Sequence, residues 1–120
     1  MSLTAYQSVR QFAETPRTTE QRLVAQITGE MIQARESALT GGALMAVLHR
    51  NREMWNVFST DCARTGNGLP DTLRAAIISL ALWIDRHTTE VMSGREPIDD
   101  LIEVNRTIME GLGASVQSAA

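Results

Sequence analysis

Three polar side chains stand where the pattern of apolar residues predicts contacts between helices. Asn51, His87 and Asn105 each interrupt an apolar stripe with spacings of three and four residues, one in each of three successive segments. If such groups are buried together, they form a hydrogen-bonded cluster that fixes the register of the packed helices. If they open onto a groove, they can contact a partner instead. Both uses stay open at this point, as does an exposed position outside the stripe.

Basic and aromatic side chains near these positions extend the set of candidates. Arg52 and Arg106 directly follow the two asparagines, and we expect both to pair with surface carboxylates. Trp55, Phe58 and Trp83 are the largest apolar groups; such residues usually fill a core, but tryptophan is also enriched at interface hot spots. The candidate structural or partner-binding residues are Asn51, Arg52, Trp55, Phe58, Trp83, His87, Asn105 and Arg106.

No arrangement of residues predicts catalysis, a metal site or a cofactor. His49 and Cys62 would lie about 20 Å apart along one helix, too far to share a metal ion. Cys62 has no histidine within a helical turn, so we expect a small core residue rather than a nucleophile. The single cysteine excludes an intramolecular disulfide, and the absence of lysine excludes a P-loop and a Schiff base. We therefore expect a protein that is not an enzyme and has no cofactor.

The charge distribution favours a protein partner over nucleic acid. All 11 basic residues are arginine, and they are dispersed among 14 acidic ones. Residues 1–60 carry six arginines and five acids, a net charge of +1, whereas residues 61–120 carry five and nine, a net charge of −4. The second half would repel a phosphate backbone, which argues against direct nucleic-acid binding.

Apolar runs are too short for a membrane span. The longest, Ala75 to Ile84, covers ten residues, whereas a helix that crosses a bilayer needs about 18. The first residues lack the pattern of a signal peptide. We expect a cytoplasmic protein without membrane contact.

Proline and glycine divide the chain into five segments of helical periodicity. The expected helices cover residues 3–12, from after Pro16 to a stop at Gly41–Gly42, about 42–63, from Pro70 to Ser93–Gly94, and from near Pro97 to a break at Gly111 and Gly113. The predicted fold class is all-α, a small bundle of four main helices plus a short N-terminal helix. It forms a single domain over residues 3–112, followed by a flexible tail over residues 113–120.

Two apolar patterns bear on how these helices pack. In the second segment the stripe is formed by Leu23, Ile27, Met31, Ala34 and Ala38. The fourth segment is apolar almost all round, which favours a central helix or a face reserved for a partner. Its apolar residues outside the main stripe are Ile78, Leu82 and Trp83. Five internal methionines would fill core gaps or give an adaptable surface for a partner helix.

Short motifs in a fixed order over residues 5–112 resemble the bacterial flagellar biosynthesis regulator FlaF family, of the α-proteobacterial type. The motifs are Ala5-Tyr6, Pro16-Arg17-Thr18-Thr19-Glu20, Asn51-Arg52-Glu53-Met54-Trp55 with Phe58, Leu69-Pro70, the run from Ile77 to Thr88, Glu90-Val91-Met92, the run from Leu101 to Arg106 with Ile108, and Gly111-Leu112.

The resemblance implies a cytoplasmic regulator of flagellum biogenesis without enzymatic activity. It would bind flagellin and promote its synthesis, its export or both, in the manner of a chaperone. An apolar surface near Trp55, Phe58 and Trp83 would accept an amphipathic segment of flagellin. A FlbT-type regulator, linked to flagellin messenger RNA, is a further candidate partner. The alternative is an RNA-binding translational regulator that acts on that messenger RNA.

Overall fold

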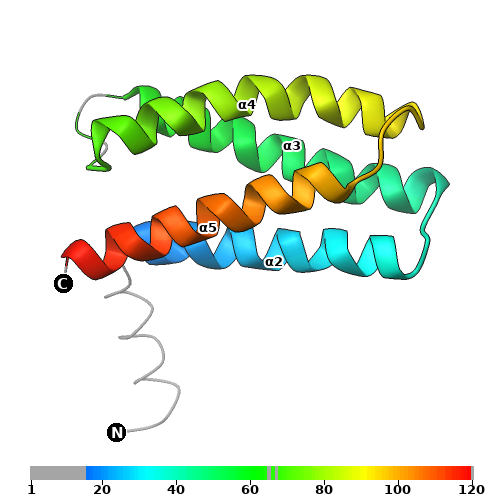
Figure 1. The fold of residues 1–120 in the computed structure, drawn as a ribbon, viewed down its shortest axis with the longest axis horizontal. Helices are drawn as coiled ribbons and strands as arrows, with labels where there is room; N and C mark the ends of the chain where they lie inside the picture. The colour runs from blue at the N-terminus through cyan, green and yellow to red at the C-terminus, as the bar shows by residue number, and fades with distance from the viewer. Residues whose placement is uncertain (1–15, 65, 67, 120) are drawn as a thin grey trace, which may run out of the picture.

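The computed structural model describes the backbone of residues 16–64, 66 and 68–119, and the side chains of residues 20–64, 66 and 68–111. This part of the chain is all-α, as predicted, and forms four helices without a strand (Figure 1). The helices are α2 (Pro16–Glu36), α3 (Gly41–Ala63), α4 (Asp71–Met92) and α5 (Asp99–Ala119). The short helix predicted over residues 3–12 lies outside the described residues.

Each helix packs against two neighbours. Contacts join α2 to α3, α3 to α4, α4 to α5 and α5 back to α2. Figure 1 shows the α3–α4 pair lying over the α2–α5 pair, with short connections between successive helices. A helix in such a ring has an inward face, two flanks and one outward face.

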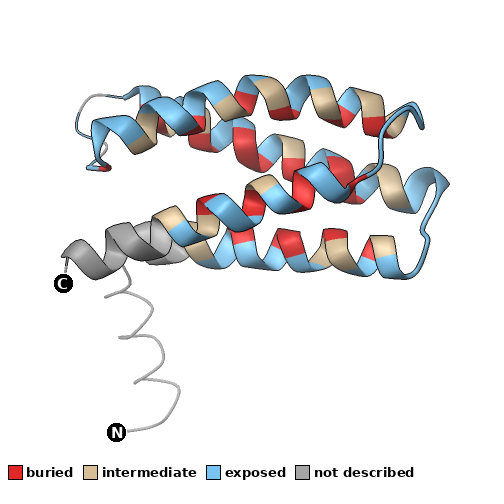
Figure 2. Cartoon of the chain, in the orientation of Figure 1, coloured by how far each residue is buried: buried red, intermediate tan, exposed pale blue. Residues whose placement is uncertain are grey.

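The core follows most of the predicted stripes. In α3 the buried residues include five that follow one another at intervals of three and four: Leu48, Asn51, Trp55, Phe58 and Cys62. Figure 2 shows buried positions turned toward the interior. Of the two uses predicted for the five internal methionines, the structure shows the first, packing in the core. Met31 and Met54 are buried, and Met45, Met92 and Met109 pack against the core.

The stripe predicted for α2 is shifted by one residue at its start. Leu23 is 41% exposed, whereas Val24 and Thr28 are buried beside Ile27 and Met31. The prediction for Leu23 is wrong because its side chain lines the open groove between α2 and α3, whereas Val24 and Thr28 are buried where α2 meets α3 and α5. A helix with two neighbours buries a wider face than a single four-residue stripe describes.

Helix α2 ends earlier than the glycine pair predicted. Ala38 lies in the left-handed region with φ of 52°, and its N–H donates to the Arg35 carbonyl while the Leu39 N–H donates to the Ala34 carbonyl. These two bonds form a Schellman motif, which ends a helix. Ala38 is therefore an exposed terminator rather than part of the core stripe, and Gly41 begins α3.

Helix α4 ends with the same motif, here built on a glycine as predicted. Gly94 has φ of 76°, its N–H donates to the Val91 carbonyl, and the Arg95 N–H donates to the Glu90 carbonyl. The Arg95 guanidinium then reaches back to both carboxylate oxygens of Glu90, at 2.6 and 3.1 Å. This hydrogen-bonded pairing lowers the pKa of Glu90 below its ordinary value.

Helix α5 continues past Gly111 and Gly113 to Ala119, so the break predicted there is wrong. A glycine in a helix interior costs about 1 kcal/mol relative to alanine, which weakens a helix without breaking it. At Gly111 a Cβ atom would lie 3.3 Å from Leu73 Cδ1, so the missing side chain lets α5 approach α4 closely. The mobility predicted for residues 113–120 stays a prediction.

Candidate partner-binding site

Asn105 of α5 is the centre of a buried hydrogen-bonded network. Its Nδ2 group donates to Asn51 Oδ1 at 2.8 Å and to Thr28 Oγ1 at 3.1 Å. Its Oδ1 atom accepts from the Trp55 indole N–H at 2.8 Å. The Thr28 hydroxyl donates in turn to the Val24 carbonyl at 2.6 Å. Side chains from α2, α3 and α5 thus meet across the middle of the bundle.

This network is closed to solvent, so it holds helices in register rather than presenting groups to a partner. Asn51 and Asn105 are completely buried, and Thr28 is 2% exposed. The two asparagines meet as the sequence suggested, but Thr28 and the Trp55 indole also take part. The sequence did not predict the role of Thr28, because the expected apolar stripe through Leu23 and Ile27 places Thr28 on its flank. A stripe that starts at Val24 includes Thr28.

His87 does not join the hydrogen bonds of this network, contrary to one of the expected arrangements. Its ring stacks on Trp83, with ring centres 4.4 Å apart and planes 15° from parallel. Its Nε2 atom lies 4.0 Å from the Asp100 carboxylate of α5. Asp100 precedes Asn105 by five residues, about 7.5 Å along the helix, and His87 Nε2 has no hydrogen-bond partner among the described residues.

The two arginines that follow the asparagines have different surroundings. Arg52 of α3 reaches across to α4, where its Nη2 donates to the Asp85 carbonyl at 2.9 Å and to the Thr89 hydroxyl at 2.6 Å. Its Nε atom lies 3.3 Å from the Asp85 carboxylate. Arg106 pairs only one turn back along α5, with Glu103 at 2.9 Å. Arg52 therefore joins two helices, whereas Arg106 forms an exposed ion pair within one.

The aromatic side chains expected at a partner surface lie mostly in the core. Trp55 is 1% exposed and Phe58 6%, and their rings meet edge to face with centres 6.4 Å apart. Trp83 is half-buried against His87. The expected apolar surface is wrong for Trp55, whose ring is sealed inside the bundle. Phe58 is largely buried but contributes to the lining of the groove between α2 and α3.

Exposed apolar side chains gather instead around the outward face of α3, which we call the outer α3 face. It comprises Leu23 of α2, Val57 of α3, and Ile78 and Leu82 of α4; Val57 and Leu82 are each 66% exposed. Ile78 and Leu82 were singled out by the all-round apolarity of α4. Val57 was missed, because one exposed valine beside the core residue Phe58 breaks no pattern.

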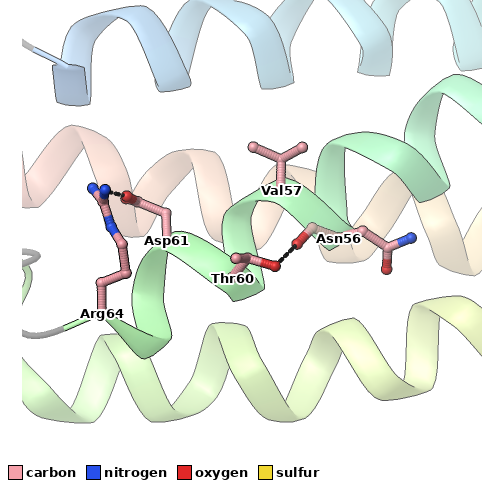
Figure 3. Close-up of a pocket in the computed structure, with 5 residues that line it drawn as sticks. All are labelled: Asn56, Val57, Thr60, Asp61 and Arg64. Atoms are coloured by element: carbon pink, nitrogen blue, oxygen red, sulfur yellow. Dashed lines mark hydrogen bonds and ion pairs between the residues drawn. The ribbon is translucent and has the colours of Figure 1, made fainter.

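Grooves on both sides of Val57 shape this face. The groove between α3 and α4 has a volume of about 520 Å³ and includes Asn56, Thr60, Ile78 and Leu82 in its lining. The groove between α2 and α3 is smaller, about 240 Å³, and includes Leu23 and Val57. A hollow along α3 itself shares Val57 with the smaller groove and Asn56 and Thr60 with the larger (Figure 3). The three form one continuous surface.

Charged groups around the outer α3 face are paired with one another. At the ends of the face Arg50 pairs with Glu30, Arg52 with Asp85, His49 lies beside Glu53, and Arg64 pairs with Asp61. Arg74 caps the end of α3, donating to the Cys62 and Arg64 carbonyls at 2.9 and 3.1 Å. Between these pairs α3 presents Asn56, Val57 and Thr60, which carry no charge.

The described residues were also compared with the requirements of a metal site and of a membrane-spanning helix. Among the side chains that the structure describes, no three His, Cys, Asp or Glu residues come together as a metal ion would require. Within the same residues, no helix has the length and apolarity needed to cross a bilayer.

A comparison with family models identifies one family over most of the chain. The model described as flagellar protein FlaF matches residues 2–112, a range that includes α2, α3, α4 and most of α5. Comparisons with curated proteins and with solved structures gave no match.

Proposed function

The chain belongs to the FlaF family of flagellar proteins, and on that premise we propose that it regulates flagellum biogenesis by binding flagellin, without catalysing a reaction. In this proposal it acts in the cytoplasm and promotes the synthesis of flagellin, its export or both. It does so as a chaperone does, by covering a segment of flagellin that would otherwise expose apolar side chains. A FlbT-type regulator is a candidate second partner.

The observation that carries this proposal is the outer α3 face. Leu23, Val57, Ile78 and Leu82 are exposed on neighbouring helices and flank shallow grooves. An apolar groove between two helices suits the apolar side of a third, and the terminal segments of flagellin are amphipathic. Exposed apolar groups that gather in one place are typical of interaction surfaces.

Ion pairing of the arginines supports a protein partner over RNA. A phosphate-binding surface needs basic groups that are clustered and available to phosphate. Here the arginines with a carboxylate within ion-pair distance include Arg35, Arg50, Arg52, Arg64, Arg74, Arg95 and Arg106.

Calorimetric titration of the purified chain with flagellin tests the proposal. We expect saturable one-to-one binding of full-length flagellin and loss of that binding when the terminal segment in contact is removed. Absence of heat with full-length flagellin would contradict it. A gel-shift series with flagellin messenger RNA at low salt tests the alternative, since a complex that dissociates steeply with added salt would indicate phosphate contacts.

A further inference from the structure

We propose that the larger groove of the outer α3 face, between α3 and α4, holds one amphipathic helix whose contact stripe is uncharged and about two turns long. This inference rests on the proposed function, which supplies a flagellar protein with amphipathic segments. It adds which of the two grooves binds that segment and which side chains the segment brings to it.

The length of the stripe follows from the lining of the groove. On α3 the lining runs from Asn56 to Ala63, and on α4 it includes Ile78 and Leu82. Seven residues of helix rise about 10.5 Å, or two turns. An occupant that lies along this stretch would contact it with positions i, i+3, i+4 and i+7 of one face.

The chemistry of the stripe follows from the charges. Asp85 is the one charged residue in the lining of this groove, and its carboxylate lies 3.3 Å from the Arg52 guanidinium. Arg52 is held there by its hydrogen bonds to the Asp85 carbonyl and the Thr89 hydroxyl. A charged side chain brought into the groove would lose water without gaining an ion pair, which is unfavourable. The complementary surface is therefore apolar or neutral.

The smaller groove fits this occupant less well. Its lining includes His49, Arg50 and Glu53, so charged groups stand along its edge. Its volume is about 240 Å³, against about 520 Å³ for the groove between α3 and α4. Leu82 belongs to the larger groove and the equally exposed Val57 to the smaller one, so the charged edge, and not apolar exposure, separates the two grooves.

Titration of groove variants with full-length flagellin tests the inference. Ile78→Glu and Leu82→Glu place a carboxylate in the groove, and we expect each to weaken binding by roughly tenfold or more. Leu39→Glu is the matched control: Leu39 and Ile78 are both 37% exposed, but Leu39 lies between α2 and α3, outside this face. We expect that control to bind within about twofold of the unchanged chain. Helical circular dichroism and thermal melting of each variant establish that it is folded, and Leu82→Ser gives a milder change for the same comparison.

Salt dependence provides a second measurement. An uncharged contact predicts that affinity changes by less than about threefold between about 0.05 and 0.5 M salt. Binding of flagellin that survives Ile78→Glu and Leu82→Glu in folded protein, or that falls steeply with salt, would overturn the inference while leaving the proposed function intact. Failure of the unchanged chain to bind flagellin would overturn both. Self-association of the chain that Leu82→Glu abolishes would assign the groove to a second copy and would also overturn the inference.

Discussion

A buried amide costs free energy unless its donors and acceptors have partners; the Asn105 amide has partners for both its groups, whereas Nδ2 of the neighbouring Asn51 has none among the described residues. The Asn105 amide contacts Thr28, Asn51 and Trp55 through hydrogen bonds of 2.8 to 3.1 Å. These partners come from two other helices, so one side chain couples α5 to both α2 and α3. Because the group is closed to solvent, its role is to specify how the helices fit together.

Replacing Asn105 should therefore destabilise the fold. Asn105→Ala removes three hydrogen bonds and leaves the buried Trp55 N–H without its acceptor, so we expect the free energy of unfolding to fall by about 2–4 kcal/mol. Urea denaturation followed by tryptophan fluorescence measures this change. Arg106→Ala, at the next position but in an exposed ion pair, should cost less than about 1 kcal/mol. Equal effects of the two substitutions would show that the network contributes little.

The pair formed by Glu90 and Arg95 predicts a pH dependence with a definite sign. The hydrogen bond from Arg95 is the main reason that the pKa of Glu90 lies below its ordinary value of 4.5. A lowered pKa in the folded state stabilises the fold above the ordinary value, and this contribution is lost as the pH falls through the lowered one. Glu90→Gln should therefore have a lower free energy of unfolding than the unchanged chain at pH 7. This difference should shrink in acid below about pH 4.5.

Urea denaturation of both proteins across this pH range tests the sign. Arg95→Gln removes the same bond from its other side and should reproduce the pH profile of Glu90→Gln. A difference that grows as the pH falls would contradict the assignment.

Helices of this chain are ended by backbone motifs, which sequence patterns locate only when a glycine is present. The Schellman motif after α4 uses Gly94, whereas the same motif after α2 uses Ala38 with φ of 52°. An alanine in the left-handed region is strained because its Cβ atom crowds the backbone. The end of α2 thus makes a small unfavourable contribution to the free energy of folding, which the end of α4 does not.

Exchanging the two residue types should shift stability in opposite directions. Ala38→Gly relieves the strain and should raise the free energy of unfolding by about 0.5–1 kcal/mol, and Gly94→Ala should lower it by about 1 kcal/mol. Thermal melting of the two variants beside the unchanged chain measures both effects. A decrease for Ala38→Gly would show that its conformation carries no strain.

What the sequence could predict differed between the middles and the ends of the helices. Apolar stripes follow directly from helix periodicity, so the existence of α2 to α5 and most of the core of α3 were predictable. The ends depended on local energies too small to read from residue type. An alanine ended α2, and the glycines at positions 111 and 113 did not end α5. The close approach of Leu73 to Gly111 is a tertiary fact that explains the glycine only after the helices are placed.

The candidate site was predictable in part for a similar reason. Polar residues within apolar stripes identified Asn51 and Asn105, but whether His87 would join them depended on where α4 and α5 cross. Ile78 and Leu82 were recognised because α4 carries more apolar residues than one buried face can use. Val57 was not, since exposure of a single residue depends on its two neighbouring helices.

Among the described residues, apolar side chains fill a closed interior, and four of the five exposed large ones lie on the outer α3 face. The interior is sealed around the Asn105 network, and the outer α3 face presents Val57, Ile78 and Leu82. The two regions lie on opposite sides of the same helix, since α3 contributes Asn51 and Trp55 inward and Val57 outward. A partner can therefore bind α3 from outside without disturbing the network.

Hydrogen–deuterium exchange of the chain with and without flagellin tests this account most directly, because it reports which backbone segments a partner protects. We predict slower exchange in residues 53–64 of α3 and 75–86 of α4 on addition of full-length flagellin, with exchange around Asn105 in α5 unchanged. Slower exchange confined to α5, or faster exchange throughout the bundle, would contradict it. The first result would place the partner elsewhere, and the second would mean that binding opens the core.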